Sequence, residues 1–258
     1  MSGSDVDPAF DVLVLGSANL DVVVRAERHP SPGETLLGHG LAEHPGGKGL
    51  NQAVAAARSG ARTAFVGALG DDAAGGLLRD VLQSEGIDAT NVASVAEPTG
   101  RALIVVADDG ENTIVVAPGA NATVSCPTPL PPARIVLAQL ELPVATVLEA
   151  FRAARADGRT TVLNPAPAAE LPRELLELAD VVVPNQHEAE LLGGPEALLA
   201  GGSRAVVVTR GGAGVEVYTA DGREQFPPFP VEPVDTTGAG DAFCGGLCAR
   251  LAAGDDLA

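Results

Sequence analysis

The sequence predicts an α/β protein with a mostly parallel central sheet, helices on both faces of that sheet, and a small additional β-sheet. Three observations support this class. Short apolar runs alternate with stretches of helical periodicity along most of the 258 residues. The chain is 46% hydrophobic but only 3% aromatic, so its core consists of Val, Leu, Ala and Ile, as in buried parallel strands. Asp108-Asp109-Gly110 separates two β-rich runs, which is typical of an antiparallel hairpin.

The first half of the chain supplies most of the strands. Residues 1–9 are polar and contain Gly, Ser and Pro, so we expect a disordered tail there. Helices are expected over residues 53–58, closed by Gly60, and around residues 77–82, closed by Gly86. The expected strands are residues 12–15, 22–24, 35–37, 63–66, 92–95, 102–106 and 113–116.

The hairpin interrupts an otherwise regular βα alternation and therefore predicts a small accessory sheet. Together with the short strands that precede the first helix, it would form a lid made of residues 20–44 and 97–118. The sequence contains no internal repeat and no linker that would separate two domains. We therefore expect a single domain over residues 1–258.

The second half continues the alternation of strands and helices. Residues 226–234 are Pro-rich and extended, and they lead to a last helical pattern through Phe243, Leu247 and Leu251. The expected strands are residues 135–138, 161–163, 181–183, 205–208 and 215–219, and the expected helices are residues 144–156, 175–178 and 195–200.

Charge and cysteine content narrow the class of function. The formal net charge of −18 argues against nucleic acid or an anionic membrane as the main partner. The three cysteines are Cys126, Cys244 and Cys248; with this odd number, no signal peptide and no membrane-spanning run, we expect reduced thiols in the cytoplasm. Cys244 and Cys248 are one helical turn apart, and packing is a better explanation for them than a metal site.

The stretch Asp235-Thr236-Thr237-Gly238-Ala239-Gly240-Asp241 precedes the last helix. Glycine lets the backbone approach a ligand, and N–H groups at a helix start bind anions. Asp241 in the first turn would accept a hydroxyl proton, which points to phosphoryl transfer. An ordinary Asp-capped loop explains the stretch equally well. Phe243 rules out Gly-x-Gly-x-x-Gly here, and Gly49 after Gly47-Lys48 rules out a P-loop.

A second Gly-rich segment, Pro45-Gly46-Gly47-Lys48-Gly49-Leu50-Asn51, also leads into a helix. Its glycines allow backbone amides to contact a small polar ligand, and Asn51 would face the same pocket. Lys48 would contact a phosphate or the substrate; a solvated loop lysine is the alternative.

Polar side chains also follow three expected strands. Asn19 and Asp21 come after the first strand and Glu141 after residues 135–138, on the side where open α/β sheets bind ligands. An amide and a carboxylate together suit sugar hydroxyls, although an Asx turn also explains Asn19 and Asp21. Asn185 and Glu188 are three residues apart at a helix start, so helix capping explains them fully, and orientation of a metal-bound water near phosphates is the alternative.

Thr209 and Gly211 follow the strand at residues 205–208 and could line a nucleotide pocket. Taken together, six motifs in this order resemble the ribokinase-like (PfkB) sugar kinases, over about residues 11–253. They are Gly16-Ser17-x-Asn19-x-Asp21, Gly46-Gly47-Lys48-Gly49-x-Asn51-Gln52-Ala53, Gln139-Leu140-Glu141, Asn164-Pro165-Ala166-Pro167, Pro184-Asn185 with Glu188, and residues 235–241. Two of them, Gly-Gly-Lys-Gly-x-Asn-Gln-Ala and Asn-Pro-Ala-Pro, are closer to the ribokinases than to fructokinases or adenosine kinases.

The resemblance implies a three-layer α/β/α fold with a β lid and ATP-dependent phosphorylation of D-ribose at O5. It implies Asp241 as catalytic base, ATP with Mg²⁺, K⁺ as activator, and a homodimer formed through the lid. The implied sugar ligands are Asn19, Asp21, Gly46, Gly47, Lys48, Asn51 and Glu141. The implied ATP and anion-hole residues are Asn185, Thr209, Gly211, Gly238, Ala239 and Gly240, with Glu188 near Mg²⁺ and Asp235 and Thr237 at the K⁺ site.

The sequence departs from the family pattern in two places. The segment between Glu190 and Ala205 is short, and the chain stops soon after the Asp241 helix, where the family continues with further helices. Two alternatives therefore remain open beside ribose phosphorylation. One is a kinase of the same fold acting on another sugar or a nucleoside; the other is a truncated, inactive sugar-binding protein. A dinucleotide oxidoreductase is disfavoured because no Gly-x-Gly-x-x-Gly follows the first strand.

Overall fold

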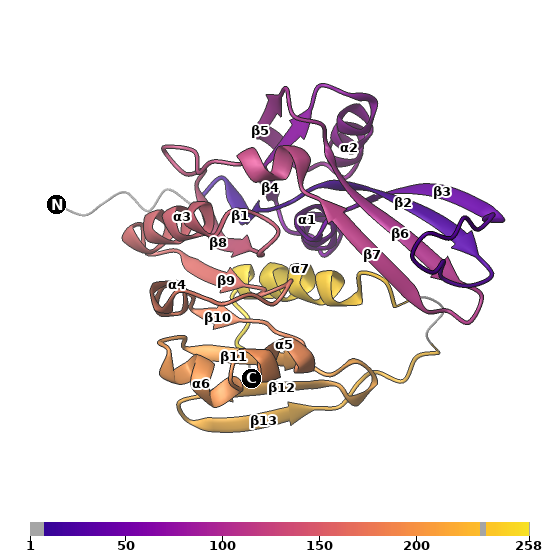
Figure 1. Cartoon of the computed structure of the whole chain (residues 1–258). Helices are drawn as coiled ribbons and strands as arrows, with labels where there is room; N and C mark the ends of the chain where they lie inside the picture. Colours follow the sequence, from indigo (N-terminus) through magenta and orange to yellow (C-terminus); the bar gives the residue numbers. More distant parts are fainter. Residues whose placement is uncertain (1–7, 233–235, 258) are drawn as a thin grey trace.

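The computed structural model describes residues 8–232 and 236–257 and contains two sheets (Figure 1). Most of the expected N-terminal tail therefore lies outside the described residues. The large sheet has nine strands in the order β13-β12-β11-β10-β9-β8-β1-β4-β5, parallel except for the antiparallel pairs β11–β12 and β12–β13. Its strands are β1 (Phe10–Leu15), β4 (Thr63–Gly70), β5 (Asp88–Val95), β8 (Ala133–Ala138), β9 (Thr160–Leu163), β10 (Val181–Val182), β11 (Ala205–Thr209), β12 (Val215–Thr219) and β13 (Gly222–Phe226).

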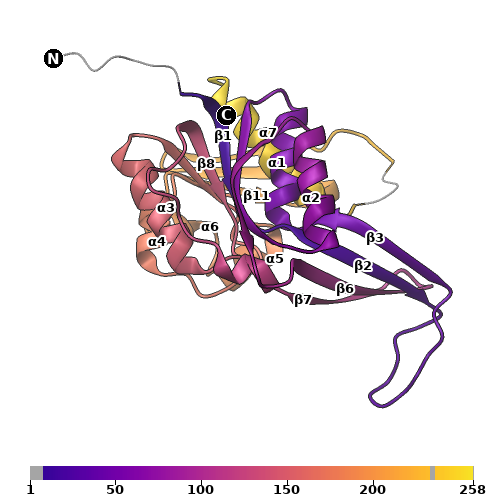
Figure 2. The ribbon, with the colours of Figure 1, turned by 90° about the horizontal axis from the view of Figure 1, so that it is seen from above.

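Helices cover both faces of this sheet, and the central strand β1 shows why. Its side chains alternate between two hydrophobic clusters, with Leu13 and Leu15 in one and Val12 and Val14 in the other. The first cluster is completed by α3 (Val144–Ala156), α4 (Arg173–Leu178), α5 (Gln186–Leu191) and α6 (Pro195–Ala200), the second by α1 (Lys48–Arg58), α2 (Ala73–Ser84) and α7 (Ala239–Ala252). Figure 2 shows α3 and α4 on one side of the sheet and α1 and α2 on the other.

The small sheet projects from one side of the large one (Figures 1 and 2). It contains β2 (Asn19–Ala26), β3 (Gly40–Gly46), β6 (Gly100–Ala107) and β7 (Asn112–Ala117) in the order β3-β2-β6-β7. β2 and β6 are parallel, and the other two pairs are antiparallel. The predicted hairpin around Asp108-Asp109-Gly110 is present as β6–β7. The predicted fold class, a three-layer α/β/α protein with a small β lid, is confirmed.

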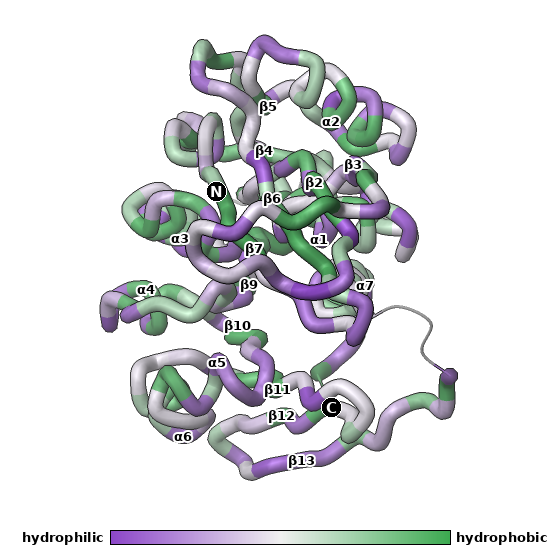
Figure 3. Tube along the Cα trace, turned by 45° about the vertical axis from the view of Figure 1, so that its right-hand side comes forward, coloured by the Kyte–Doolittle hydropathy of each residue, from purple (hydrophilic) through white to green (hydrophobic). Residues whose placement is uncertain are grey.

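Two details of the sequence prediction were wrong. Residues 35–37 form no strand, and β3 instead begins at Gly40, because Arg25 at the end of β2 pairs with Gly40. Leu37 lies in the connecting loop and is 90% exposed. The strand β13 was missed because its five residues, Gly-Arg-Glu-Gln-Phe, carry no apolar periodicity and are all exposed at the sheet edge. Figure 3 shows β13 largely in hydrophilic colours.

Two short 3₁₀ turns complete the fold, η1 (Gly119–Thr123) after the hairpin and η2 (Gly211–Ala213) after β11. Cys244 and Cys248 are buried in the cluster under α7, where desolvation raises the pKa of both thiols, in agreement with a packing role. Among the described helices, none combines the length and apolar character needed to cross a membrane.

Candidate functional site

The first turns of α1 and α7 meet beside the carboxyl ends of the central strands. Each helix starts after a glycine with positive φ, Gly47 at 90° and Gly238 at 71°, a backbone region that favours glycine. A Cβ on Gly49 would lie 2.5 Å from the Cα of Gly16, so α1 begins in direct backbone contact with the end of β1. The bare glycines therefore bring two helix N-termini, both able to hold an anion, to one place.

Asp241 is the third residue of α7 and is 7% exposed. Its carboxylate accepts hydrogen bonds from two consecutive side chains of α1. Asn51 Nδ2 donates to Oδ2 at 3.1 Å, and Gln52 Nε2 donates to Oδ1 at 2.9 Å. Both oxygens of the predicted base are thus held by amides.

The lid side of the site carries the predicted sugar ligands. Asn19 and Asp21 belong to β2 rather than to an Asx turn, and Asn19 pairs with Gly46 across β2 and β3. A Cβ on Gly46 would lie 2.2 Å from a carboxylate oxygen of Asp21, so any larger residue there would displace that carboxylate. Asn121 of η1 donates to Asn19 Oδ1 at 2.7 Å and also bonds the Ala18 backbone.

Glu141 connects the lid side to α1. Its Oε2 accepts from Ser17 Oγ at 2.5 Å and from the backbone N–H of Lys48 at 3.1 Å. The pKa of Asp21 is raised to about 6, mainly by burial, with further contributions from Glu141 and Asp241 that His44 partly offsets. The interactions among Asp21, Glu141 and Asp241 indicate that three predicted carboxylates share one site.

A polar pocket of about 200 Å³ lies between the start of α7 and the exits of β10 and β11. Lys48, for which the sequence left contact with a phosphate or with the substrate open and the resemblance implied the sugar, lines this pocket. The remaining lining residues are Asn164, Ala166, Val183, Asn185, Glu188, Thr209, Thr236, Gly238, Ala239, Gly240, Asp241 and Cys244.

Asn185 and Glu188 form the capping box that their spacing predicted. Asn185 Oδ1 accepts from the Glu188 N–H at 2.8 Å, and Glu188 Oε2 accepts from the Asn185 N–H at 2.8 Å. Asn185 also forms a β-bridge with Thr209, which brings both to the same wall of the pocket. Burial raises the pKa of Glu188, with a smaller increase from Asp241, whereas Lys48 lowers it.

Not every predicted site residue reaches this pocket. Gly211 is an exposed residue of η2, outside the pocket lining, and Thr237 is exposed before α7. Asp235, predicted at a cation site, lies outside the described residues.

The prediction missed a row of buried amides behind Asp241. Gln52, Gln139 and Asn164 are buried and hydrogen-bonded to one another, and Gln52 reaches Asp241. All three stand in motifs that the sequence analysis quoted, but it assigned them no role. Their position next to assigned residues in those motifs was the signal that pointed to them.

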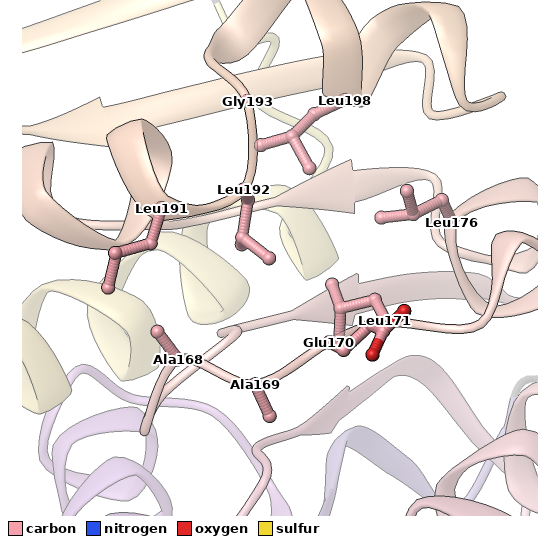
Figure 4. A pocket seen from close by; sticks show the side chains of 9 residues that line it. All are labelled: Ala168, Ala169, Glu170, Leu171, Leu176, Leu191, Leu192, Gly193 and Leu198. Carbon is pink, nitrogen blue, oxygen red and sulfur yellow. The ribbon is translucent and has the colours of Figure 1, made fainter.

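A second hollow of about 520 Å³ lies on the other face of the sheet, between α4, α5, α6 and residues 168–171. Figure 4 shows its lining, in which Leu171, Leu176, Leu191, Leu192 and Leu198 dominate and Glu170 is the one ionisable group. Its chemistry offers nothing to a phosphate or a sugar, so the polar pocket at α7 is the candidate active site.

Comparison with known proteins gives a consistent result. Residues 9–258 match the family of pfkB family carbohydrate kinases. A bifunctional ribokinase/ribose-5-phosphate isomerase A from Fructilactobacillus sanfranciscensis is 42% identical, over 93% of this chain but only 48%, about half, of that protein. The ribokinase of Staphylococcus aureus is 39% identical over 93% of this chain and 86% of its own length.

Solved structures of ribokinases also have a fold similar to that of this chain. The ribokinase of Arabidopsis thaliana complexed with ribose and ATP superposes with a TM-score of 0.86 and 32% identity, covering 96% of this chain and 88% of its own. The ribokinase of Thermotoga maritima gives a TM-score of 0.88 and 34% identity, with coverages of 96% and 87%.

Proposed function

This chain belongs to the pfkB family of carbohydrate kinases, and we propose that it transfers the γ-phosphoryl group of ATP to O5 of D-ribose, giving ribose 5-phosphate and ADP. The relatives named ribokinase support ribose as the substrate. The observation that carries the proposal is the position of Asp241. Its carboxylate borders the polar pocket and accepts a hydrogen bond from Asn51, a proposed sugar ligand, so we assign it a position between the two proposed substrates.

In the proposed reaction, the sugar's primary hydroxyl lies against Asp241. As O5 attacks the γ-phosphorus, the O5–H proton passes to the carboxylate, and the bond from the γ-phosphorus to the bridging oxygen of ADP breaks. The N–H groups of Gly238 and Gly240 at the start of α7 would hold the transferred phosphoryl, helped by the positive end of α7. The N–H of Ala239 donates to the Thr236 carbonyl at 3.1 Å in this structure, so it would have to leave that bond to take part. Most of the rate enhancement would come from positioning and from charge neutralisation.

The sugar would be held by groups that both donate and accept hydrogen bonds. Asp21 and Glu141 offer carboxylate oxygens, and Asn19 and Asn51 offer amides. Gly46 and Gly47 would contribute close backbone approach, which their contacts with Asp21 and Asn19 support. Lys48 lines the polar pocket, so we assign its ammonium group to the phosphate and its backbone to Glu141.

We further propose that ATP enters with Mg²⁺. The described residues contain no cluster of three or more His, Cys, Asp or Glu that would cage a metal, so the phosphates would supply most ligands. Glu188 and Asn185 offer oxygen donors at the pocket wall and would orient metal-bound water. Mg²⁺ would supply charge neutralisation of the phosphates, which a chain of net charge −18 needs. Thr209 and Gly211 would lie toward the nucleotide.

A monovalent cation, K⁺, is proposed near Asp235 and Thr237. This assignment rests on the resemblance of the segment before α7 to the family's cation loop. Turnover in K⁺ compared with Na⁺ or choline buffers at constant ionic strength tests it.

We propose a homodimer formed through the small sheet. Its outer face carries Leu41, Leu103 and Val115, which are 73%, 51% and 62% exposed, while Asp21 lies on the opposite face. Exposed apolar side chains on a sheet face favour a protein partner there. A second copy of the chain would cover it.

We also propose that the protein works in the cytoplasm. Cys126, Cys244 and Cys248 are free thiols in the structure, and a reducing compartment keeps such thiols reduced.

ADP release with Mg-ATP and K⁺ tests the proposed reaction against ribose, 2-deoxyribose, fructose and adenosine. We expect ribose to give the highest kcat/KM and Asp241→Asn to lower kcat by about 10²–10⁴-fold, the usual contribution of a general base. Preference for deoxyribose would support a relative such as the deoxyribokinase of Salmonella typhi, which is 34% identical. Ribose binding by calorimetry without any turnover would instead support a sugar-binding protein.

A further inference from the structure

We propose that Gln52 is a positioning residue for catalysis, holding the carboxylate of Asp241 in its reactive orientation from behind. This inference rests on the proposed role of Asp241 as the base. Gln52 would not contact the substrates and would affect the reaction only through the side chain of Asp241.

Gln52 and Asn51 are neighbours on α1, but their surroundings differ. Gln52 is 0% exposed, whereas Asn51 is half-buried. A fully buried amide has no route to a sugar or nucleotide. Any effect of Gln52 on the reaction must therefore act through Asp241, to which its Nε2 donates at 2.9 Å.

The direction of the hydrogen bonds in the buried row is fixed by the backbone. The carbonyl oxygen of Val183 only accepts, so Asn164 must turn Nδ2 toward it, at 2.8 Å, and Oδ1 toward Gln52. Gln52 must then direct Nε2 at both Asn164 Oδ1 and Asp241 Oδ1, because an ionised carboxylate also only accepts.

The same row fixes the other end of Gln52. Its Oε1 accepts from Gln139 Nε2 at 2.6 Å, so the amide cannot rotate without breaking this bond as well. Gln139 in turn packs against Gly16 directly after β1, where its Oε1 would lie 2.6 Å from a Cβ on Gly16. Gln52 is thus held at both ends by buried neighbours.

One consequence follows for Asp241. A donor on Oδ1 and another on Oδ2 fix the plane of the carboxylate, which sets where the proton of the sugar hydroxyl can be received. Removing Gln52 would leave Asn51 alone to hold the carboxylate.

The test is Gln52→Met, which keeps the length of the side chain and removes the donor. We expect kcat for ribose to fall by about 10-fold or more, as for a misplaced catalytic group, with KM for ribose and for ATP within about threefold of wild type. Gln139→Met removes the hydrogen bond to Gln52 Oε1 but leaves Asp241 its own donors, so it should lower kcat less. Gln83→Met, at an exposed position on α2, is the background control and should leave both parameters unchanged.

If Gln52 had a purely structural role, Gln52→Met would lower the unfolding midpoint but would not lower kcat selectively while KM stays unchanged. Unchanged kcat in a folded Gln52→Met protein overturns the inference. If that variant fails to fold, the graded loss of kcat expected in Gln139→Met decides instead, and wild-type kcat there overturns it. If the wild-type protein does not phosphorylate ribose, the proposed function fails. Crystal structures of the wild type and of Gln52→Met would still test whether Gln52 orients Asp241. Asp241 must change its side-chain orientation in Gln52→Met relative to wild type, and an unchanged carboxylate refutes the role of Gln52.

Discussion

Gly245 of α7 faces the backbone of Gln52 in α1 so closely that a Cβ at position 245 would lie 2.4 Å from the Gln52 carbonyl oxygen. The side chain of Ala55 would be only 2.6 Å away. The bare backbone at Gly245 is therefore what lets α7 approach α1. This approach brings Asp241 within hydrogen-bond distance of Asn51 and Gln52.

Gly245→Ala should therefore be destabilising although alanine is the better helix former. The clash is with backbone atoms that cannot turn away, and overpacking of this kind costs about 1–3 kcal/mol. Gly246→Ala is the matched control, since its Cβ would meet only Ser59 Oγ at 3.6 Å. That variant should be neutral or more stable by up to about 1 kcal/mol. Chemical denaturation measures both, and equal stabilities would contradict the packing argument.

The raised pKa of Asp21 predicts that kcat/KM for ribose decreases at acidic pH. Its pKa is raised to about 6, mainly by burial, so the carboxylate is ionised above that pH and protonated below it. Because the ionised form is the one proposed to accept hydrogen bonds from the sugar hydroxyls, kcat/KM for ribose should fall as the pH drops through about 6. Asp21→Asn should lower kcat/KM and flatten the profile in that range. Glu43→Gln, which neutralises an exposed carboxylate on β3, is the control and should keep the decrease in kcat/KM at acidic pH. If this decrease persists in Asp21→Asn, it arises from another group.

Two substitutions of Asn185 in the capping box of α5 distinguish an effect on stability from an effect on nucleotide affinity. Asn185→Ala removes the cap and should cost about 1 kcal/mol of unfolding free energy, and it should also raise KM for ATP. Asn185→Ser retains a capping oxygen and should recover most of the stability. If Asn185 contacts the phosphate side as proposed, the KM for ATP stays raised in the serine variant. A KM that recovers together with stability would leave Asn185 with capping alone.

Glu216 on β12 interacts with three side chains, one directly after β11, one on β12 and one on β13. It accepts hydrogen bonds from Arg210, Arg223 and Tyr218, and these interactions hold its pKa below the usual value. The stabilisation is therefore complete above the usual glutamate pKa near 4.5 and is lost as the pH falls through the lower folded-state value. Glu216→Gln should lower the unfolding free energy at pH 7 by about 1–2 kcal/mol. The difference from wild type should shrink toward pH 3, and a pH-independent difference would count against the ionic network.

The apolar outer face of the small sheet predicts the oligomeric state. Leu103→Lys places a charge in the centre of the row formed by Val22, Leu103 and Val115 and should convert a dimer into a monomer. Leu77→Lys, at an exposed leucine on α2, should leave the mass unchanged. Analytical ultracentrifugation distinguishes the two; a wild-type monomer at all concentrations would refute the dimer.

Local signals in the sequence were sufficient for most elements. The helix over residues 144–156 was predicted with its observed bounds, because apolar periodicity and Gly158 mark its course and end. The capping box was predicted from the Asn185–Glu188 spacing alone. The position of Asp241 in the first turn of α7 followed from the glycines before it. These features depend on residues at most a few positions apart.

Contacts between distant residues were decided only by the tertiary structure. β3 begins at Gly40 because β2 supplies its partners, and the edge strand β13 forms on β12 without any periodicity of its own. Lys48 lines the polar pocket at the start of α7 because α1 packs against α7. Gln52 meets Asp241 across 189 positions of sequence, which no spacing rule detects. The sequence by itself determined the fold class, the family resemblance and the residue types of the site. The tertiary structure decided which atoms meet, since two helix starts converge only after the sheet and its glycines have brought them together.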